Sequence, residues 1–153
     1  MAEIYIPPVA FFFSVSVDGG EGNDSSFKEA SGMEIEIDIE EINEGGNNNF
    51  KHRLPGRSKY RNLVLKRGLV KNNTSLHDWI TKILLSEANL DEPVEKKKIL
   101  VNLKYPDGDV VMSWSFENAF PVKWSISNFN SQENSLVIET LEFAYQKFQV
   151  ENP

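Results

Sequence analysis

The 153-residue sequence contains no cysteine and only two histidines, which excludes several kinds of chemistry. Without cysteine, the chain has no disulfide bond, no thiolate metal ligand and no cysteine nucleophile. His52 and His77 lie 25 residues apart, and neither belongs to a His-Glu-x-x-His motif, so the sequence predicts no zinc site. We expect both histidines to be solvated, one in a loop and one on a helix surface.

Long apolar runs are absent as well. No apolar stretch approaches the roughly 20 residues of a membrane span, and the first residues lack the basic segment and the apolar run of a signal peptide. We therefore expect the chain to be made and folded in the cytoplasm. Its composition, with 40% hydrophobic and 25% charged residues and a net charge of −7, is typical of a globular protein with a single domain over residues 1–153.

The two signs of charge are separated along the sequence. Residues 1–44 hold eleven acidic residues and a single base, Lys28, whereas residues 45–77 hold eight bases and no acid. Two such segments either pair across a hairpin of one molecule or attract a neighbouring copy of the chain. The basic segment alone would suggest nucleic-acid binding, but the net negative charge argues against it.

A strict alternation of apolar and acidic residues runs from Met33 to Ile42. It predicts a β-strand with Ile35, Ile37 and Ile39 on one face. We expect this face to enter the core and the opposite face to be wet. Alternate residues on a flat strand do not converge on one point, so neither a calcium site nor a glycosidase pair is expected. The acidic row on the wet face consists of Glu34, Glu36, Asp38 and Glu40.

The rest of the chain predicts a mainly β domain, a mostly antiparallel sandwich or barrel-like structure with one helix packed on it. Apolar, β-rich stretches predict strands at residues 9–17, 61–67, 99–105, 110–116, 122–127 and 136–148. Pro106-Asp107-Gly108 predicts the tight turn of a hairpin, and Phe120-Pro121 is expected to interrupt the chain between two strands. A helix is indicated from Ser75 onward by apolar residues at helical spacing. Its core-facing residues are Leu76, Trp79, Ile80, Ile83 and Leu84.

An irregular connection at residues 43–60 separates the acidic strand from the next one. Loops of this length are uncommon in compact domains and are often functional. Glycine, asparagine, proline and basic side chains are frequent in it. The residues that we expect to make contacts there are Asn47, Asn48, Lys51, Arg53, Leu54, Pro55, Gly56, Arg57 and Lys59.

Catalytic motifs are not recognisable. No nucleophile, base and orienting group can be assembled from the sequence, and no glycine-rich phosphate loop is present. We therefore expect no enzymatic activity, no cofactor and no bound metal. Trp79, Trp114 and Trp124 could form a sugar-binding platform, although packing in the core is the simpler interpretation. A soluble carbohydrate-binding β-sandwich module is thus an alternative function.

Several segments, in their order along the chain, resemble one family. They are Pro8-Val9-Ala10-Phe11-Phe12-Phe13, Glu44-Gly45-Gly46-Asn47-Asn48 leading to Leu54-Pro55-Gly56-Arg57, and Leu63-Val64-Leu65-Lys66-Arg67-Gly68 before a helix with a tryptophan. The closing Pro121-Val122-Lys123-Trp124 and Glu139-Thr140-Leu141-Glu142-Phe143 are similar too. Together these segments resemble the tail tube proteins of contractile phages and the inner tube proteins of phage-derived contractile injection systems.

The resemblance implies a structural, non-enzymatic protein that forms hexameric rings stacked into a hollow tube inside a contractile sheath. Sheath contraction would drive this tube through the envelope of a target. The implied partners are further copies of the chain, the sheath protein, baseplate or spike proteins, terminal cap proteins and a cargo of effector protein or DNA. The particle would be assembled in the bacterial cytoplasm and could be released from the cell.

Two surface assignments follow from the tube architecture. We expect the connection at residues 43–60 to contact the adjacent ring, because its length and positive charge suit a segment that orders on assembly. We expect the acidic row to face the lumen, because Asn62, Val64 and Lys66 on the adjoining strand continue a mainly polar surface. Such a bore would repel DNA phosphates and acidic cargo near its wall.

Overall fold

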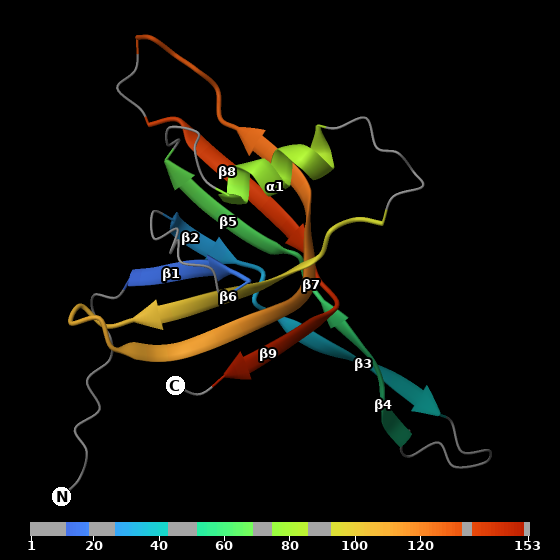
Figure 1. Cartoon of the computed structure of the whole chain (residues 1–153). Helices are drawn as coiled ribbons and strands as arrows, with labels where there is room; N and C mark the ends of the chain where they lie inside the picture. The colour runs from blue at the N-terminus through green and yellow to red at the C-terminus, as the bar shows by residue number, and fades with distance from the viewer. Residues whose placement is uncertain are drawn as a thin grey trace, which may run out of the picture.

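The structure is a computed structural model that describes residues 12–18, 27–42, 52–68, 75–85, 93–132 and 136–151. Within these ranges, the chain forms nine strands and one helix, α1 (Ser75–Leu84) (Figure 1). The predicted fold class, a mainly antiparallel β-structure with a single helix, is confirmed. The strands are β1 (Phe12–Val17), β2 (Phe27–Ser31), β3 (Ile35–Ile42), β4 (His52–Tyr60), β5 (Leu63–Gly68), β6 (Lys97–Lys104), β7 (Val110–Ile126), β8 (Ile138–Ala144) and β9 (Lys147–Glu151).

The body of the molecule is built on one continuous path of antiparallel strands, in the order β1-β6-β7-β8-β5-β2. Strand β7 is 17 residues long and belongs to two sheets. Its first part pairs with β6 and β9, and its second part, from Phe120 onward, pairs with β8. Because β1 and β2 at the ends of the path lie close together, the sheets face each other around a common core.

Side chains from both sheets and from α1 fill this core. Leu76, Trp79 and Ile80 of the helix are buried, and the Trp79 ring stacks on Phe143 with a centroid distance of 5.7 Å. The Trp79 indole also donates a hydrogen bond to the main-chain oxygen of Glu95. Ile83 and Leu84 are partly buried against the same cluster. None of the helical residues described here forms a segment long and apolar enough to cross a membrane.

The predicted hairpin is confirmed, since β6 and β7 pair across a turn in which the Gly108 amide donates to the Tyr105 carbonyl. The prediction that Pro121 interrupts the chain is wrong, because β7 continues through it. From Phe120 onward β7 pairs only with β8 among the described strands, and proline is tolerated on such an edge, here beside a bulge. The predicted strand at 136–148 is divided into β8 and β9.

Candidate functional site: assembly surfaces

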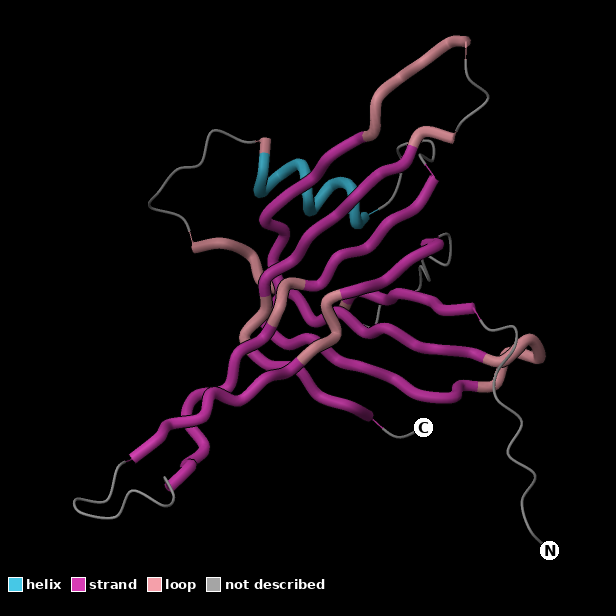
Figure 2. Tube along the Cα trace, turned by 180° about the vertical axis from the view of Figure 1, so that it is seen from behind, coloured by secondary structure: helices cyan, strands magenta, loops and turns pink. Residues whose placement is uncertain are grey.

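Strands β3 and β4 form a separate two-stranded sheet, here called the arm, which projects from the body of the molecule (Figures 1 and 2). Ile35 pairs with Tyr60 where the arm leaves the body, and Ile42 pairs with His52 toward its outer end. No other described strand pairs with the arm. All of its residues except the partly buried Asp38 and Gly56 are exposed, so both of its faces are accessible to solvent. A lone two-stranded hairpin is only marginally stable in water, which means that the arm gains from contact with another surface.

One face of the arm is apolar. Ile35, Ile37 and Ile39 are 50%, 51% and 54% exposed, and Tyr60, the cross-strand partner of Ile35, extends the same face. The prediction that the three isoleucines enter the core of their own protomer is wrong, because β3 pairs with β4 and not with a strand of the body. Contiguous apolar side chains of this kind mark interaction surfaces. We call these three residues and Tyr60 the isoleucine face.

The opposite face of the arm carries the acidic row, and bases of the same protomer neutralise part of it. Lys59 Nζ lies 3.0 Å from Asp38 Oδ1, and at the base of the arm Arg61 Nε lies 3.2 Å from Glu34 Oε2. All four side chains are well exposed, so solvent screens these ion pairs and each contributes little stability. The complementary acidic and basic segments therefore meet at least partly within one molecule, across the hairpin.

The connection predicted as irregular over residues 43–60 is a strand over 52–60, and Asn47, Asn48 and Lys51 lie outside the described residues. Pro55 and Gly56 signal a turn in the sequence, but Gly56 lies at a bulge of β4. A Cβ on Gly56 would lie 2.9 Å from the Asp38 carbonyl oxygen, so glycine allows the two strands to approach here. The other predicted contact residues on this strand are Arg53, Leu54, Arg57 and Lys59.

The outer face of the β2-β5-β8-β7 sheet is a second polar surface. The strand register places Lys66 opposite Glu29 and Lys123 opposite Glu142, so charges of opposite sign are neighbours on this face. Asn62 Nδ2 donates a hydrogen bond to Glu142 Oε1 at 3.0 Å. Although the arm forms its own sheet, Glu34 of the acidic row lines one hollow with Asn62 and Val64, so the two polar surfaces adjoin at the base of the arm.

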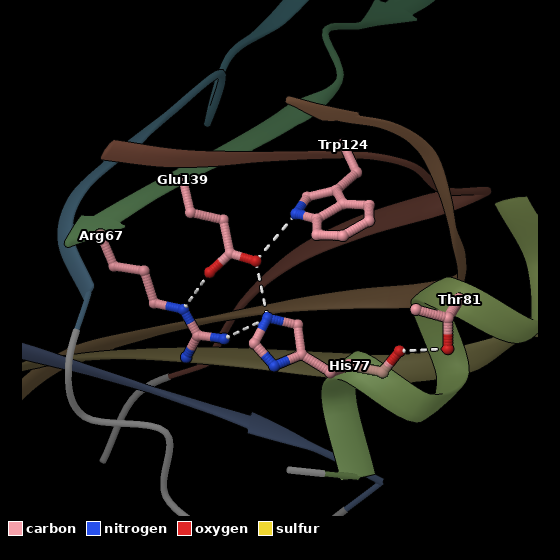
Figure 3. A network of polar contacts seen from close by, with 5 residues as sticks. All are labelled: Arg67, His77, Thr81, Trp124 and Glu139. Carbon is pink, nitrogen blue, oxygen red and sulfur yellow. Dashed lines mark hydrogen bonds and ion pairs between the residues drawn. The ribbon is translucent and has the colours of Figure 1, made fainter. Parts of the chain in front are cut away.

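A polar network is buried where α1 meets β5, β7 and β8 (Figure 3). Glu139 accepts hydrogen bonds from Arg67 Nε at 2.8 Å, from Trp124 Nε1 at 2.8 Å and from His77 Nε2 at 2.6 Å. Arg67 and Glu139 are 0% exposed and His77 is 3% exposed. The prediction that His77 is solvated is therefore wrong, while His52 is exposed on β4. The network attaches the helix to the sheets.

The sequence did contain a signal for this network. Glu139 occupies an inward position in the alternating row that also contains Leu141 and Phe143, where an unpaired carboxylate would be costly. Arg67 also occupies an inward position, two residues after the buried Leu65 on β5. The strand register sets Arg67 directly opposite Glu139. An acid and a base at inward positions of two strands thus indicate a buried pair, once the pairing of those strands is known.

Glu139 is expected to make the protein sensitive to acid. Burial disfavours its charged form, but hydrogen bonds from Arg67 and His77, together with their charges, hold the pKa of Glu139 below its ordinary value of 4.5. A lowered folded-state pKa gives stability that is present above the ordinary pKa and is lost as the pH falls through the folded-state pKa. We expect the Tm of the unassembled protein to fall below about pH 4.5 through this group.

Thermal unfolding between about pH 5 and about pH 3 tests this expectation. The matched comparison is Glu139→Gln, which removes the titrating group and leaves the surface acids in place. Its Tm should change less over this interval than the Tm of the parent protein. Equal changes in the two proteins would assign the acid sensitivity to other carboxylates.

Within the described part of the chain, no three His, Asp or Glu side chains are grouped closely enough to hold a metal ion. The tryptophans form no exposed platform either. Trp79 is buried, and Trp114 and Trp124 are partly buried against the core. Among the described residues, the exposed surfaces include the arm and the outer sheet faces.

Comparisons with known proteins support a role in assembly. The model of the family T4-like virus tail tube protein gp19 matches residues 9–149. A chain from the sheath/tube terminator of the extracellular contractile injection system PVC, in its extended state, is 30% identical, with 99% of this chain and 100% of that chain covered and a TM-score of 0.80. A chain from the PVC sheath-tube complex in the extended state is 28% identical, with coverage of 97% and 93% and a TM-score of 0.77.

More distant structures share the fold. Hcp1 from Flavobacterium johnsoniae is 16% identical, with 91% of this chain and 94% of that chain covered and a TM-score of 0.54. No curated protein matches the sequence significantly. The resemblance recognised in the sequence is confirmed, and no observation supports the carbohydrate-binding alternative. The chain therefore belongs to the T4-like virus tail tube protein family, and its role is that of a structural subunit of a tube.

Proposed function

We propose that the chain forms hexameric rings that stack into the inner tube of a contractile phage tail or a contractile injection system. The tube is a rigid hollow conduit and not an enzyme. Its partners are further copies of the chain, the sheath, baseplate or spike proteins and a terminal cap. Effector protein or DNA passes through the lumen. The particle is assembled in the bacterial cytoplasm and acts after release.

The main observation in support of this proposal is the exposed isoleucine face of the arm. Three isoleucines, each about half exposed, project from a sheet that has no third described strand. Covering their exposed area would contribute on the order of 3 kcal/mol per arm. A contact of this kind between different surfaces of identical copies repeats from one copy to the next, and it generates a ring or a helical stack.

We assign the arm to the contact between adjacent rings. We assign residues 43–51, which include Asn47, Asn48 and Lys51 and link β3 to β4 in the sequence, to the same contact. If a protein surface covers the isoleucine face, the opposite face with Glu36 and Asp38 is turned away from that surface. We propose that it faces the bore, where Lys59 and Arg61 reduce the negative charge of the wall.

Replacing the isoleucine face tests the proposed function. The triple variant Ile35→Thr, Ile37→Thr and Ile39→Thr keeps β-branched residues on the strand and removes most of the apolar surface. We expect this variant to fold with a nearly unchanged Tm, because the three side chains lie outside the core, and to form no tubes. Electron microscopy and sedimentation of the purified protein measure tube formation.

The matched control is the triple variant Glu36→Gln, Asp38→Asn and Glu40→Gln on the other face of the same strand. It is expected to form tubes, and a density map of those tubes shows whether the acidic row lines the bore. Normal tubes from the isoleucine variant would contradict the role assigned to the arm. An acidic row on the outer surface would contradict only the assignment to the bore.

A further inference from the structure

The hollow at the base of the arm lies where the chain bends from the body into the arm (Figures 1 and 2). The strands are interrupted there, because residues 32–34 separate β2 from β3 and residues 61–62 separate β4 from β5. Gly32 has a φ of +86°, and a Cβ on it would overlap the Asn62 carbonyl oxygen, so glycine permits the close approach of the two segments. The hollow measures about 630 Å³, about twenty times the ~30 Å³ that one water molecule occupies in the liquid.

The lining of the hollow combines charge with apolar surface. Its charged residues are two acids, Glu34 and Glu142, and one base, Arg61, so one negative charge is in excess. Val64, which is partly buried on β5, adds an aliphatic surface next to them. A ligand that fits this lining carries a positive charge and an apolar part.

Each carboxylate in the hollow has one oxygen that is not engaged by the protein. Arg61 Nε lies 3.2 Å from Glu34 Oε2, and Asn62 Nδ2 donates a hydrogen bond to Glu142 Oε1 at 3.0 Å. Among the described residues, Glu34 Oε1 and Glu142 Oε2 make no hydrogen bond or ion pair. Two acceptor oxygens from separate segments of the chain therefore remain for a ligand.

The side chain of arginine matches this set of groups. Its planar guanidinium carries five N–H donors and binds carboxylates through paired hydrogen bonds. Its methylene stem packs on apolar surface, such as that of Val64, while the charged head stays in a polar environment. Lysine has the same charge but fewer donors. A DNA phosphate would instead place its negative charge beside Glu34 and Glu142, which is unfavourable.

We propose that the hollow binds an arginine side chain of a polypeptide cargo in the lumen of the tube. This inference rests on the proposed function, in which the acidic row and the polar surface next to it face the bore. It assigns the cargo to basic polypeptides and not to DNA. Every copy in a ring repeats the hollow around the bore. An exposed ion pair is weak, so a cargo with several arginines is held by several hollows at once and still moves along the tube.

Fluorescence anisotropy with assembled tubes tests the site. The probe is a short labelled peptide of alternating arginine and serine. We expect parent tubes to bind this peptide, and tubes of the double variant Glu34→Gln with Glu142→Gln to bind it about tenfold more weakly, because two charge pairs are lost. Both substitutions keep the size of the side chain and lie outside the core, so tubes should still form. Unchanged binding to the double variant would overturn the site.

The matched control is Glu36→Gln with Glu40→Gln, which removes the same charge from the same acidic row but not from the lining of the hollow. We expect it to change binding by no more than about twofold, since solvent screens charges away from the site. Equal losses in the two double variants would assign binding to the general field of the bore and overturn the site. A single-stranded oligodeoxynucleotide that binds parent tubes as tightly as the peptide would overturn the assignment of the cargo.

The unassembled protein separates this inference from the proposed function, because the hollow lies within one copy of the chain. In an NMR titration with N-acetylarginine amide, the amide signals of Gly32, Asn62 and Val64 should shift more than those of β6 and β9. No shift at the hollow would overturn the site even if tubes form. A density map of empty tubes in which a side chain of another copy fills the hollow would also overturn it. If the signals shift but the parent protein forms no tubes, the proposed function and the assignment to cargo both fail, and only the arginine site stands.

Discussion

Glu139→Gln should lower the free energy of unfolding of the unassembled protein by about 3–5 kcal/mol at neutral pH, which is the usual cost of breaking a buried ion pair. The substitution preserves the size of the side chain but leaves the charge of Arg67 in the core without its counter-charge. It also weakens the attachment of α1 through His77, because an amide is a poorer acceptor than a carboxylate. Chemical denaturation measures the change.

The control for this prediction is Glu142→Gln, three residues along the same strand and on the outer face of the sheet. Its side chain bonds to the exposed Asn62, and we expect a change within about 0.5 kcal/mol. Replacing both members of the buried pair, as Arg67→Met with Glu139→Leu, should recover part of the lost stability because no isolated charge remains. Equal losses from Glu139→Gln and Glu142→Gln would contradict the stabilising role of the network.

Trp79→Ala should be similarly costly, at about 3–5 kcal/mol, because it removes a buried indole and leaves a cavity against Phe143. The loss should appear in the unassembled protein, before any effect on tubes. Lys82→Ala on the exposed side of the same helix is the control, and we expect its effect to be within about 0.5 kcal/mol. An unchanged Tm for Trp79→Ala would show that the helix does not contribute to the core as its burial indicates.

The sequence predicted those elements whose burial pattern is simple. The helix was recognisable because Leu76, Trp79 and Ile80 repeat at helical spacing, and they are buried in the structure. The hairpin of β6 and β7 was recognisable from its turn residues. The acidic strand was also placed correctly along the chain, since β3 spans Ile35–Ile42. Local periodicity was sufficient in these cases.

The missed elements depend on contacts that local patterns do not encode. Strand β2 has few apolar residues and, among the described strands, pairs only with β5 at an edge. Strand β4 contains Pro55 and Gly56, which normally signal turns, but the segment is held as a strand by its pairing with β3. The alternation of apolar and acidic residues on β3 predicted one apolar face and one acidic face. It did not show which surface covers the apolar face. The burial of His77 required knowledge that α1 packs against Glu139.

The long strand β7 has a mechanical consequence for a tube subunit. Its 17 residues pass without interruption from the sheet with β6 and β9 to the sheet with β8. A compressive or shearing force on one sheet is therefore transmitted to the other through the covalent backbone of β7 and its three ladders of hydrogen bonds, to β6, β9 and β8, rather than through side-chain packing alone. Stiffness of the subunit under axial load would then depend on backbone continuity around Ala119 and Phe120.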